Sequence, residues 1–357
     1  MKRLFSLLCS IVTCALLLPA FSIQASADSN TDCTRYLIPV TLSPIDPTVY
    51  RVATWLCAQG SLNGKTVQVL VHGSTYDHNY WDFPSVPQKY SYVRQITGAG
   101  YATLNMDRIG TGLSDHPPAL SVTLQSNAYV LHQLVQALRN GKVYGIRFPK
   151  VMLVGHSFGS VITVAEASQF ADVDGVITTG IMHTVNATGA ATVFSSFYPV
   201  ELDSKFAQSK LPLGYLTSIP GVRKSIFYNP DNADPSVISL DETLKQTITD
   251  SELATVLTGL SPTSSLQVRV PVLVAVGAKD ITVCGLLVSC AKSSIITSRE
   301  ALFYPPQACL EGYALPSSGH AINLHLNASQ WFQAAIQWAN RRIGSSSTNP
   351  PTQPCYP

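Results

Sequence analysis

The sequence predicts an α/β fold built on a mostly parallel, doubly covered sheet. Short apolar runs alternate with helix-like segments from residue 67 to residue 343, which is typical of parallel strands joined by right-handed crossovers. Two strand-like runs, residues 35–42 and 49–56, lie either side of a proline-rich turn and predict an N-terminal antiparallel hairpin. The long region 183–262 interrupts the alternation, which predicts an inserted cap.

Hydrophobic patterns assign the strands and helices of this alternation. Continuous apolar runs indicate buried parallel strands, and they cover residues 67–71, 101–106, 150–154, 173–178 and 271–276. Apolar residues at helical spacing, such as Leu131, Leu134, Val135 and Leu138, indicate helices. The predicted helices cover residues 88–99, 121–140, 158–170 and 328–343.

The interrupting region is predicted to lie over one edge of the sheet. It is rich in Ser, Thr, Pro, Phe and Tyr, and it has a helical pattern only in pieces such as residues 241–258. We therefore expect a core of residues 28–182 and 263–343, with residues 183–262 inserted as the cap. Residues 344–357 are rich in Ser and Pro and are expected to form an irregular tail.

Residues 1–27 have the pattern of a secretory signal peptide. Lys2 and Arg3 precede an apolar run over residues 4–20, and small residues follow at 25–27, where a signal peptidase would cleave. Serine, threonine and cysteine interrupt this run, whereas about 20 continuous apolar residues are needed to cross a bilayer. We therefore expect a secreted protein that keeps no stable membrane anchor after cleavage.

Removal of the signal would leave six cysteines, an even number that indicates disulfides in an exported chain. A hairpin centred near Ile45 places residues whose numbers sum to 90 opposite each other, which pairs the first two of these cysteines. The next two can close a short loop, and elimination pairs the last two. The expected disulfides are Cys33–Cys57, Cys284–Cys290 and Cys309–Cys355.

Composition and charge exclude two classes of protein. Hydrophobic residues make up 46% of the chain and charged residues 12%, which excludes a disordered, highly charged polymer. Lys and Arg number 23 and Asp and Glu 21, and loss of Lys2 and Arg3 with the signal would make the two totals equal. A nucleic-acid-binding protein normally carries a basic excess, so we expect no nucleic-acid partner.

The pentapeptide Gly-His-Ser-Phe-Gly at residues 155–159 carries the most informative chemical motif. It stands between a predicted strand and a predicted helix, and a serine on such a turn is held in a strained backbone with its hydroxyl above the sheet. Gly155 and Gly159 leave the crowded positions beside it free of side chains, and the helix N-terminus adds a positive dipole. Ser157 is therefore the candidate nucleophile.

A serine nucleophile needs a base to take its proton and an acid to orient that base. Asp280 follows the strand at residues 271–276, and His320 precedes the last helix. The chain order Ser157, Asp280, His320 and the placement of all three on loops at one edge of the sheet predict a catalytic triad.

Two alternatives for this triad are disfavoured by their positions. His325 is the rival base, but it lies within an apolar stretch rather than on a loop at the sheet edge. An acid after the strand 173–178 is the rival for Asp280, but the loop at residues 179–183 contains no carboxylate.

Four other ionisable residues near the motifs are interpreted as structural. His72 and His156 flank the motif turns, and we expect neighbouring groups to orient their rings. Asp107 and Arg108 are adjacent after the strand at 101–106, and we expect a buried pair that supports the following loop.

Together these motifs resemble α/β-hydrolases that use a Ser-His-Asp triad, over roughly residues 67–343. Residues 71–84 (VHGSTYDHNYWDFP) are similar to the HG loop of that superfamily, and residues 106–117 (MDRIGTGLSDHP) to the stretch after its fourth strand. The resemblance implies the α/β-hydrolase fold, with an oxyanion hole formed by the backbone N–H groups of Ser74 and Phe158. The chain lacks the HGGG loop of some lipases and esterases, so no specialisation for bulky esters is implied.

The resemblance also implies an activity, that of a secreted serine hydrolase cleaving a carboxylic ester or lactone through an acyl-enzyme on Ser157. The predicted cap carries aromatic residues with few charges among them, which favours an apolar small-molecule substrate. Three alternatives stay open: a peptidase or an acyltransferase with the same triad, and a non-catalytic homologue that only binds a ligand.

No sequence pattern indicates a metal or a cofactor. The chain has no HxxH, HExxH or paired CxxC spacing, no GxGxxG after a strand and no Walker loop, so none is expected. Asn186 and Asn327 begin N-x-Ser/Thr patterns, whose glycosylation depends on the producing cell. The natural substrate and the oligomeric state are not indicated.

Overall fold

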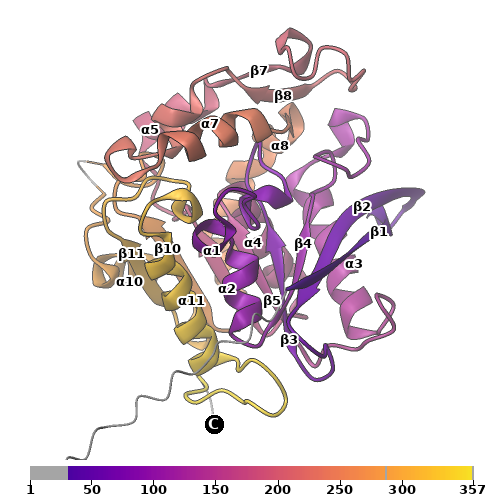
Figure 1. Ribbon diagram of the computed structural model, residues 1–357, viewed down its shortest axis with the longest axis vertical. Helices are drawn as coiled ribbons and strands as arrows, with labels where there is room; N and C mark the ends of the chain where they lie inside the picture. Colours follow the sequence, from indigo (N-terminus) through magenta and orange to yellow (C-terminus); the bar gives the residue numbers. More distant parts are fainter. Residues whose placement is uncertain (1–30, 286–287, 356–357) are drawn as a thin grey trace, which may run out of the picture.

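The computed structural model describes residues 31–285 and 288–355 and contains an eight-stranded sheet with helices on both faces (Figure 1). The strand order is β1-β2-β4-β3-β5-β6-β10-β11, with β1 and β2 antiparallel to their neighbours and the other six strands parallel. The predicted fold class is confirmed. The strands are β1 Asp32–Ser43, β2 Asp46–Ala58, β3 Thr66–Val71, β4 Ala102–Met106, β5 Lys150–His156, β6 Gly175–Thr179, β10 Val272–Gly277 and β11 Glu311–Leu315.

The helices of the core divide between the two faces of the sheet. On one face, α3 and α4 pack together, and their apolar residues share one hydrophobic cluster with the sheet and α10. On the other face, the side nearer the viewer in Figure 1, α2 and α11 form a second cluster that is rich in aromatic residues. The helices are α1 Pro87–Tyr90, α2 Tyr92–Gly98, α3 Leu124–Arg139, α4 Phe158–Phe170, α10 Ser293–Glu300 and α11 Ala328–Arg342.

The N-terminal hairpin has the predicted register and is longer than predicted. Cys33 lies opposite Cys57 in the antiparallel pair, as the sum rule requires, and the strands extend to within two residues of each other. All three expected disulfides join their cysteines, with Cα atoms 4.1, 5.7 and 5.9 Å apart in chain order. The predicted signal, residues 1–27, lies outside the described residues.

Two predicted helices have different bounds in the structure. The helix expected at residues 88–99 is divided into α1 and α2 because Ser91 is extended, with φ −90° and ψ 108°, and its hydroxyl caps the N–H of Arg94. The helix expected at residues 121–140 begins only at Leu124, after Thr123 and Ser126 form a reciprocal capping box.

Between β6 and β10 the chain forms a small antiparallel sheet of order β7-β8-β9 and several short helices. They lie at the top of Figure 1, above the main sheet. We call residues 183–262 the cap segment. Its elements are α5 Ala187–Phe194, β7 Phe197–Pro199, β8 Tyr215–Ser218, α6 Arg223–Phe227, α7 Pro235–Leu244, β9 Ile248–Thr249 and α8 Asp250–Thr255, and α9 Pro262–Ser265 begins at its last residue.

The helix predicted at residues 241–258 is wrong. Helix α7 ends at Leu244, because Lys245 takes an extended ψ of 147°, and the chain then pairs as β9 with β8. A new helix, α8, starts after Thr249, whose side chain and Glu252 form a capping box. The apolar residues do have helical spacing, but the capping box at Thr249 and the pairing of β9 with β8 divide this stretch between two helices.

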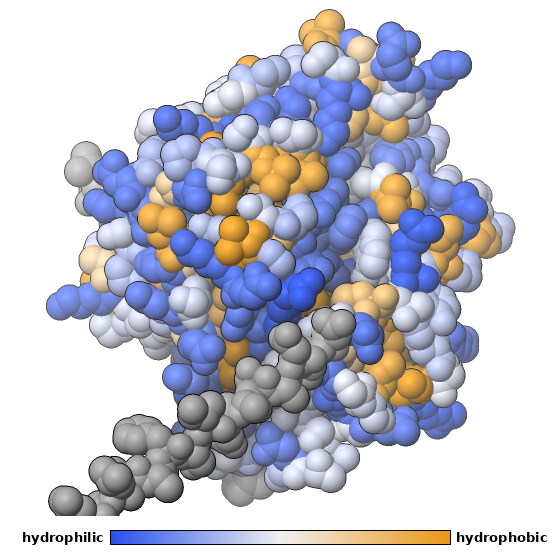
Figure 2. Space-filling view, in the orientation of Figure 1, coloured by the Kyte–Doolittle hydropathy of each residue, from blue (hydrophilic) through white to orange (hydrophobic). Residues whose placement is uncertain are grey.

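One face of the molecule can be examined for exposed hydrophobic residues in Figure 2. On this face they form separate small patches among hydrophilic residues. In the described part of the chain, no helix combines the length and the apolar character needed to cross a membrane.

The hairpin disulfide offers a test of how far cross-linking stabilises this fold. Replacing both Cys33 and Cys57 by serine should lower the free energy of unfolding by about 2–4 kcal/mol, because the cross-link restricts a loop of 24 residues in the unfolded chain. Urea unfolding of the two forms measures the difference. The matched control, Cys284→Ser with Cys290→Ser, opens a loop of only 6 residues and should cost about 1 kcal/mol less. Equal losses for the two pairs would contradict this account.

Candidate active site

Ser157 lies on a strained turn between β5, which ends at His156, and α4, which begins at Phe158. Its φ of 53° and ψ of −121° are rare for a residue with a side chain, and its N–H donates to Thr179 O at 2.7 Å. The two motif glycines make this turn possible. A Cβ on Gly155 would come within 2.5 Å of Gly159 O, and one on Gly159 within 2.2 Å of Val71 O. The local geometry is that of a nucleophile elbow.

Asp280 and His320 are joined by a hydrogen bond. His320 Nδ1 lies 2.8 Å from Asp280 Oδ2, and both side chains are buried. The other Asp280 oxygen accepts from the N–H and hydroxyl of Thr282, at 2.9 and 2.6 Å. Asp280 can therefore hold the Nδ1–H tautomer of His320 and leave Nε2 free to act as a base.

Ser157 and His320 open onto the same cavity. It has a volume of about 100 Å³ and is lined largely by apolar side chains, most of them from the cap segment. Among the residues that the structure describes, no hydrogen bond joins the Ser157 hydroxyl to His320. The two side chains are related by lining the same cavity. Its lining includes Val161, Ile181, Val193, Phe194, Phe197, Leu253, Val256, Leu257 and Leu260.

The two predicted oxyanion donors also line this cavity. Phe158 is the first residue of α4, where backbone N–H groups have no partner inside the helix, and Ser74 follows the HG pair. Gly73 brings the two loops together, since a Cβ there would lie 2.9 Å from Ser157 Cβ. Within residues 31–285 and 288–355, neither N–H donates to another protein group, so both are available to a substrate oxygen.

His72 and His156 are buried, and neighbouring groups orient their rings as expected. His72 donates through Nδ1 to Gly73 O at 2.9 Å and accepts the Arg108 N–H at Nε2 at 3.0 Å. Burial, reinforced by the charge of Arg108, lowers its pKa. His156 contacts the hydroxyl of Thr179 through Nδ1 and stacks on Tyr80 at 4.1 Å, and burial lowers its pKa as well. Both are neutral supports of the loops.

The expected pair between Asp107 and Arg108 is wrong, although both residues are buried. Asp107 accepts from the ring and backbone N–H groups of His78, at 2.7 and 2.8 Å. Arg108 forms its ion pair with Glu252 in the cap segment. Adjacent residues in this extended stretch direct their side chains to different neighbours, so adjacency in sequence did not indicate the partner.

A second buried ion pair connects the cap segment to the loop of Gly73, Ser74 and Thr75, which we call the oxyanion loop after its proposed role. Arg223 makes two hydrogen bonds of 2.9 Å to Asp241, and both side chains are buried. Its remaining N–H groups donate to the hydroxyl and carbonyl of Thr75, at 2.8 and 3.2 Å. Although burial opposes it, the Asp241 carboxylate raises the pKa of Arg223, which keeps the guanidinium charged. Thr75 has a φ of 57°, so this contact holds a strained residue next to Ser74.

Comparison with known proteins assigns the chain to a family through its sequence. Residues 68–334 match the model of the alpha/beta hydrolase family. The chain belongs to the alpha/beta hydrolase family. No curated protein matches it significantly in sequence.

Solved structures agree with this α/β-hydrolase assignment at the level of fold. A thermophilic esterase from Thermogutta terrifontis is 17% identical, with a TM-score of 0.54 over 85% of this chain and 97% of the other. A putative aryl esterase from Burkholderia cenocepacia is 16% identical, with a TM-score of 0.57 over 86% and 98%. Monoglyceride lipase from Saccharomyces cerevisiae is 14% identical, with a TM-score of 0.58 over 88% and 97%.

Sequence reasoning missed two residues of this α/β-hydrolase site. Thr282 anchors the Asp280 carboxylate, and the spacing Asp-x-Thr on a loop, which favours this local bond, was the available signal. Arg223 supports the oxyanion loop from more than 140 residues away in sequence. No local pattern marks such a contact, because it depends on how the cap segment packs on the core.

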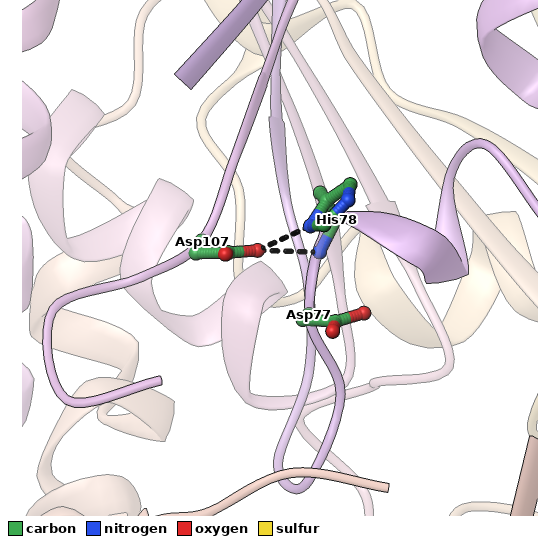
Figure 3. A group of neighbouring side chains, drawn as sticks. All are labelled: Asp77, His78 and Asp107. Carbon is green, nitrogen blue, oxygen red and sulfur yellow. Dashed lines mark hydrogen bonds and ion pairs between the residues drawn. The ribbon is translucent and has the colours of Figure 1, made fainter. Parts of the chain in front are cut away.

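Asp77, His78 and Asp107 form one of the clusters in which a metal could be considered. In Figure 3 the Asp107 carboxylate points at the ring and backbone of His78, while the Asp77 carboxylate extends away from Asp107. Every carboxylate oxygen already accepts a hydrogen bond: Asp77 from Asn79 N and Gln246 Nε2, and the second Asp107 oxygen from Leu113 N. These residues are explained as loop anchors.

The two asparagines of the glycosylation patterns use their side-chain amides inside the fold. Asn186 Nδ2 donates to Ile281 O and Cys284 O, at 2.9 and 3.1 Å, and Asn327 Nδ2 donates to Pro316 O at 2.8 Å. Since the glycan is attached to this nitrogen, glycosylation in the folded state would break these bonds.

His325, the rival base, lies away from the cavity lining and has a structural role. Its Nδ1 donates to Ala321 O at 2.9 Å, and its Nε2 accepts the N–H groups of Gly319 and Asn229, at 2.9 and 3.1 Å. Burial lowers its pKa to about 4. The neutral ring thus holds the loop that carries His320.

The depressed pKa of His325 predicts a loss of stability in mild acid. The unfolded chain binds the proton near pH 6.5 and the folded chain only near pH 4, so stability is complete above pH 6.5 and falls as the pH drops towards 4. The loss through this group is about 3 kcal/mol. Urea unfolding at a series of pH values measures it, and His325→Gln should have a shallower slope across the window. An identical slope in the variant would refute the assignment.

Proposed function

We propose that this α/β-hydrolase is a serine hydrolase that cleaves carboxylic esters or lactones of apolar small molecules. The observation that carries the proposal is the cavity shared by Ser157 on its strained turn and His320 bonded to Asp280. Ser74 and Phe158, whose N–H groups have no partner among the described residues, line the same space. This is the set of groups that acyl transfer requires.

In the acylation step, His320 Nε2 takes the proton of the Ser157 hydroxyl as Ser157 Oγ attacks the carbonyl carbon. The imidazolium that forms is stabilised by Asp280, whose carboxylate accepts hydrogen bonds from Thr282 and His320. The oxyanion accepts from the Ser74 and Phe158 N–H groups, each worth about 3–4 kcal/mol in such sites. His320 then returns its proton to the leaving alcohol.

In the second step, water replaces the leaving alcohol and attacks the acyl-enzyme. His320 takes a proton from the water, and the resulting tetrahedral intermediate uses the same two N–H groups. When it collapses, Ser157 Oγ leaves and recovers its proton from His320. For a lactone, the leaving alcohol is tethered to the acyl group, and the product is a hydroxy acid.

The cavity lining limits the substrates that fit. Apart from His320, no described side chain that lines the cavity is ionisable, so a charged acyl group would lose its hydration without gaining a partner. A volume of about 100 Å³ is small beside the roughly 300–1,000 Å³ of sites that enclose a drug-sized ligand. The proposal therefore specifies a short or compact apolar acyl group.

The proposed setting is outside the cell. The pattern of residues 1–27 supports export, and the three disulfides of the mature chain are the kind that persist in oxidising compartments. A peptidase or an acyltransferase would use the same triad with an amide as substrate or a second alcohol as acceptor, and a ligand-binding homologue would bind without turnover. The apolar walls favour an ester over a peptide, whose backbone needs polar partners.

Replacing the proposed nucleophile tests the assignment directly. Ser157→Ala should reduce kcat for hydrolysis of p-nitrophenyl acetate and butyrate by about 10⁴-fold or more, because the covalent path is lost while the folded core remains. A serine-directed fluorophosphonate should label the parent protein once and the variant not at all, as read by intact-mass spectrometry.

The matched control is Ser168→Ala, which changes a serine on the helix that follows Ser157, eleven residues further along the chain. It should retain both turnover and labelling. A parent protein that is inert to esters and to the phosphonate would contradict the proposal and favour a binding protein. Turnover of aminoacyl anilides without ester hydrolysis would favour a peptidase.

The cavity volume predicts acyl-chain selectivity. The kcat/KM for p-nitrophenyl butyrate should exceed that for the decanoate by about tenfold or more, and Leu260→Ala, which removes part of a cavity wall, should narrow the ratio severalfold. Leu202→Ala, at an exposed cap position that does not line the cavity, is the control. A parent enzyme that prefers the decanoate, or a ratio unaffected by Leu260→Ala, would refute this account of the cavity.

A further inference from the structure

Three ionisable side chains meet between α3 and α4, at the opposite end of α4 from Ser157. His132 belongs to α3, Glu166 to the second half of α4, and Asp172 follows the end of that helix. One ligand atom from each lies within 4.8 Å of the other two. Glu166 is nine residues beyond Ser157, which is about 13 Å along the helix axis. The cluster is therefore separate from the candidate active site.

Glu166 is fully buried, and no described protein group satisfies its carboxylate. Its side chain has 0% exposure, and neither oxygen has a hydrogen-bond partner in the described part of the chain. Oδ1 of Asp172 is likewise buried without a partner. Burial, with Asp172 as a second contributor, raises the pKa of Glu166. Three carboxylate oxygens thus converge where only a cation or a shared proton could compensate them.

The imidazole of His132 faces the same point. Its Nδ1 lies 2.8 Å from Asp172 Oδ2, without the alignment of a hydrogen bond, and 3.9 Å from Glu166 Oε1, which is too far for one. The ring is stacked on Phe170 at 3.9 Å, which fixes its plane. Gln136 Nε2 donates to Asp172 Oδ2 at 2.6 Å and orients that carboxylate, as outer partners of metal ligands do.

The nearest cation already has other partners. Arg139 donates to the main-chain carbonyl of Asp172 and to the Asp174 carboxylate, at 2.7 and 2.6 Å, rather than to the unpartnered oxygens. The C-terminal end of α4 adds a negative dipole beside the cluster. The electrostatics of this end of α4 therefore favour an added positive charge.

We propose that His132, Glu166 and Asp172 form a structural binding site for a divalent transition-metal ion, with Zn²⁺ as the first choice. One imidazole nitrogen and two carboxylates are ligands that Zn²⁺ and Mn²⁺ accept, whereas Mg²⁺ and Ca²⁺ prefer oxygen alone. A charge of +2 balances the two carboxylates. The ion would join α3 to the end of α4.

An access path and a contrast support the site. A groove of about 400 Å³ between β1 and α3 is lined by His132 and Gln136, so an ion can reach the cluster from solvent. In the other cluster, Asp77, His78 and Asp107 (Figure 3), each carboxylate oxygen has a hydrogen-bond donor, and no unpartnered carboxylate remains for an ion.

The test uses untagged, disulfide-intact protein that has been treated with EDTA and then dialysed. Titration calorimetry with ZnCl₂ should show one equivalent bound, and the thermal midpoint should rise by several degrees with Zn²⁺ and less with MgCl₂ or CaCl₂. His132→Gln and Glu166→Gln should each weaken binding by about a hundredfold and abolish the midpoint shift. His132 is 24% exposed, so its variant tests the site even if Glu166→Gln folds poorly.

The control is His78→Asn, which changes a histidine that is 23% exposed and also lies beside two carboxylates. This variant should bind Zn²⁺ like the parent. Absence of Zn²⁺ and Mn²⁺ binding at millimolar metal would overturn the proposal, as would binding that survives His132→Gln. The parent protein could also bind no metal while Glu166→Gln is more stable than the parent in the absence of metal. That result would show that Glu166 and Asp172 share a proton instead.

Discussion

The close approach of helix α4 to the ends of β3 and β5 is the constraint on which the candidate site depends. At Gly155 and Gly159 a Cβ would meet main-chain atoms at 2.5 and 2.2 Å, and main chain cannot move aside as a flexible side chain can. The same turn presents the Ser157 hydroxyl, the Phe158 N–H and the positive end of the helix dipole. The proposed nucleophile and the proposed oxyanion donor are therefore positioned as one unit, and displacing the helix would disturb both.

Buried charges fasten the cap segment to this unit. Arg108 of the core pairs with Glu252 of the cap segment, and Arg223 of the cap segment, held by Asp241, donates to Thr75 of the core. Separating such buried pairs leaves uncompensated charges and typically costs about 3–5 kcal/mol. Because the cap segment also supplies most of the apolar cavity wall, these contacts connect the substrate-facing surface to the oxyanion loop.

The parts that sequence predicted are those that local pattern or geometry decides. Apolar runs predicted the strands, the GxSxG turn predicted α4 with its bounds, and simple hairpin arithmetic predicted that Cys33 faces Cys57. The cap segment was less accessible, because a capping box at Thr249 and pairing with β8 override its helical spacing. Motif searches also gave no reason to group His132, Glu166 and Asp172, whose separation in sequence matches no common metal-binding pattern.

The position of the Ser74 N–H shows how a short HG loop can be held without further glycines. On one side of Ser74, His72 donates to Gly73 O and itself accepts from the Arg108 N–H. On the other side, Arg223 holds Thr75 through its hydroxyl and carbonyl. His72 and Arg223 are both buried. Arg223 belongs to the cap segment, and Arg108, whose N–H donates to His72, pairs with Glu252 of the cap segment. The proposed oxyanion donor is therefore set from both directions, and under the proposed function the packing of the cap segment becomes a condition for turnover as well as for substrate choice.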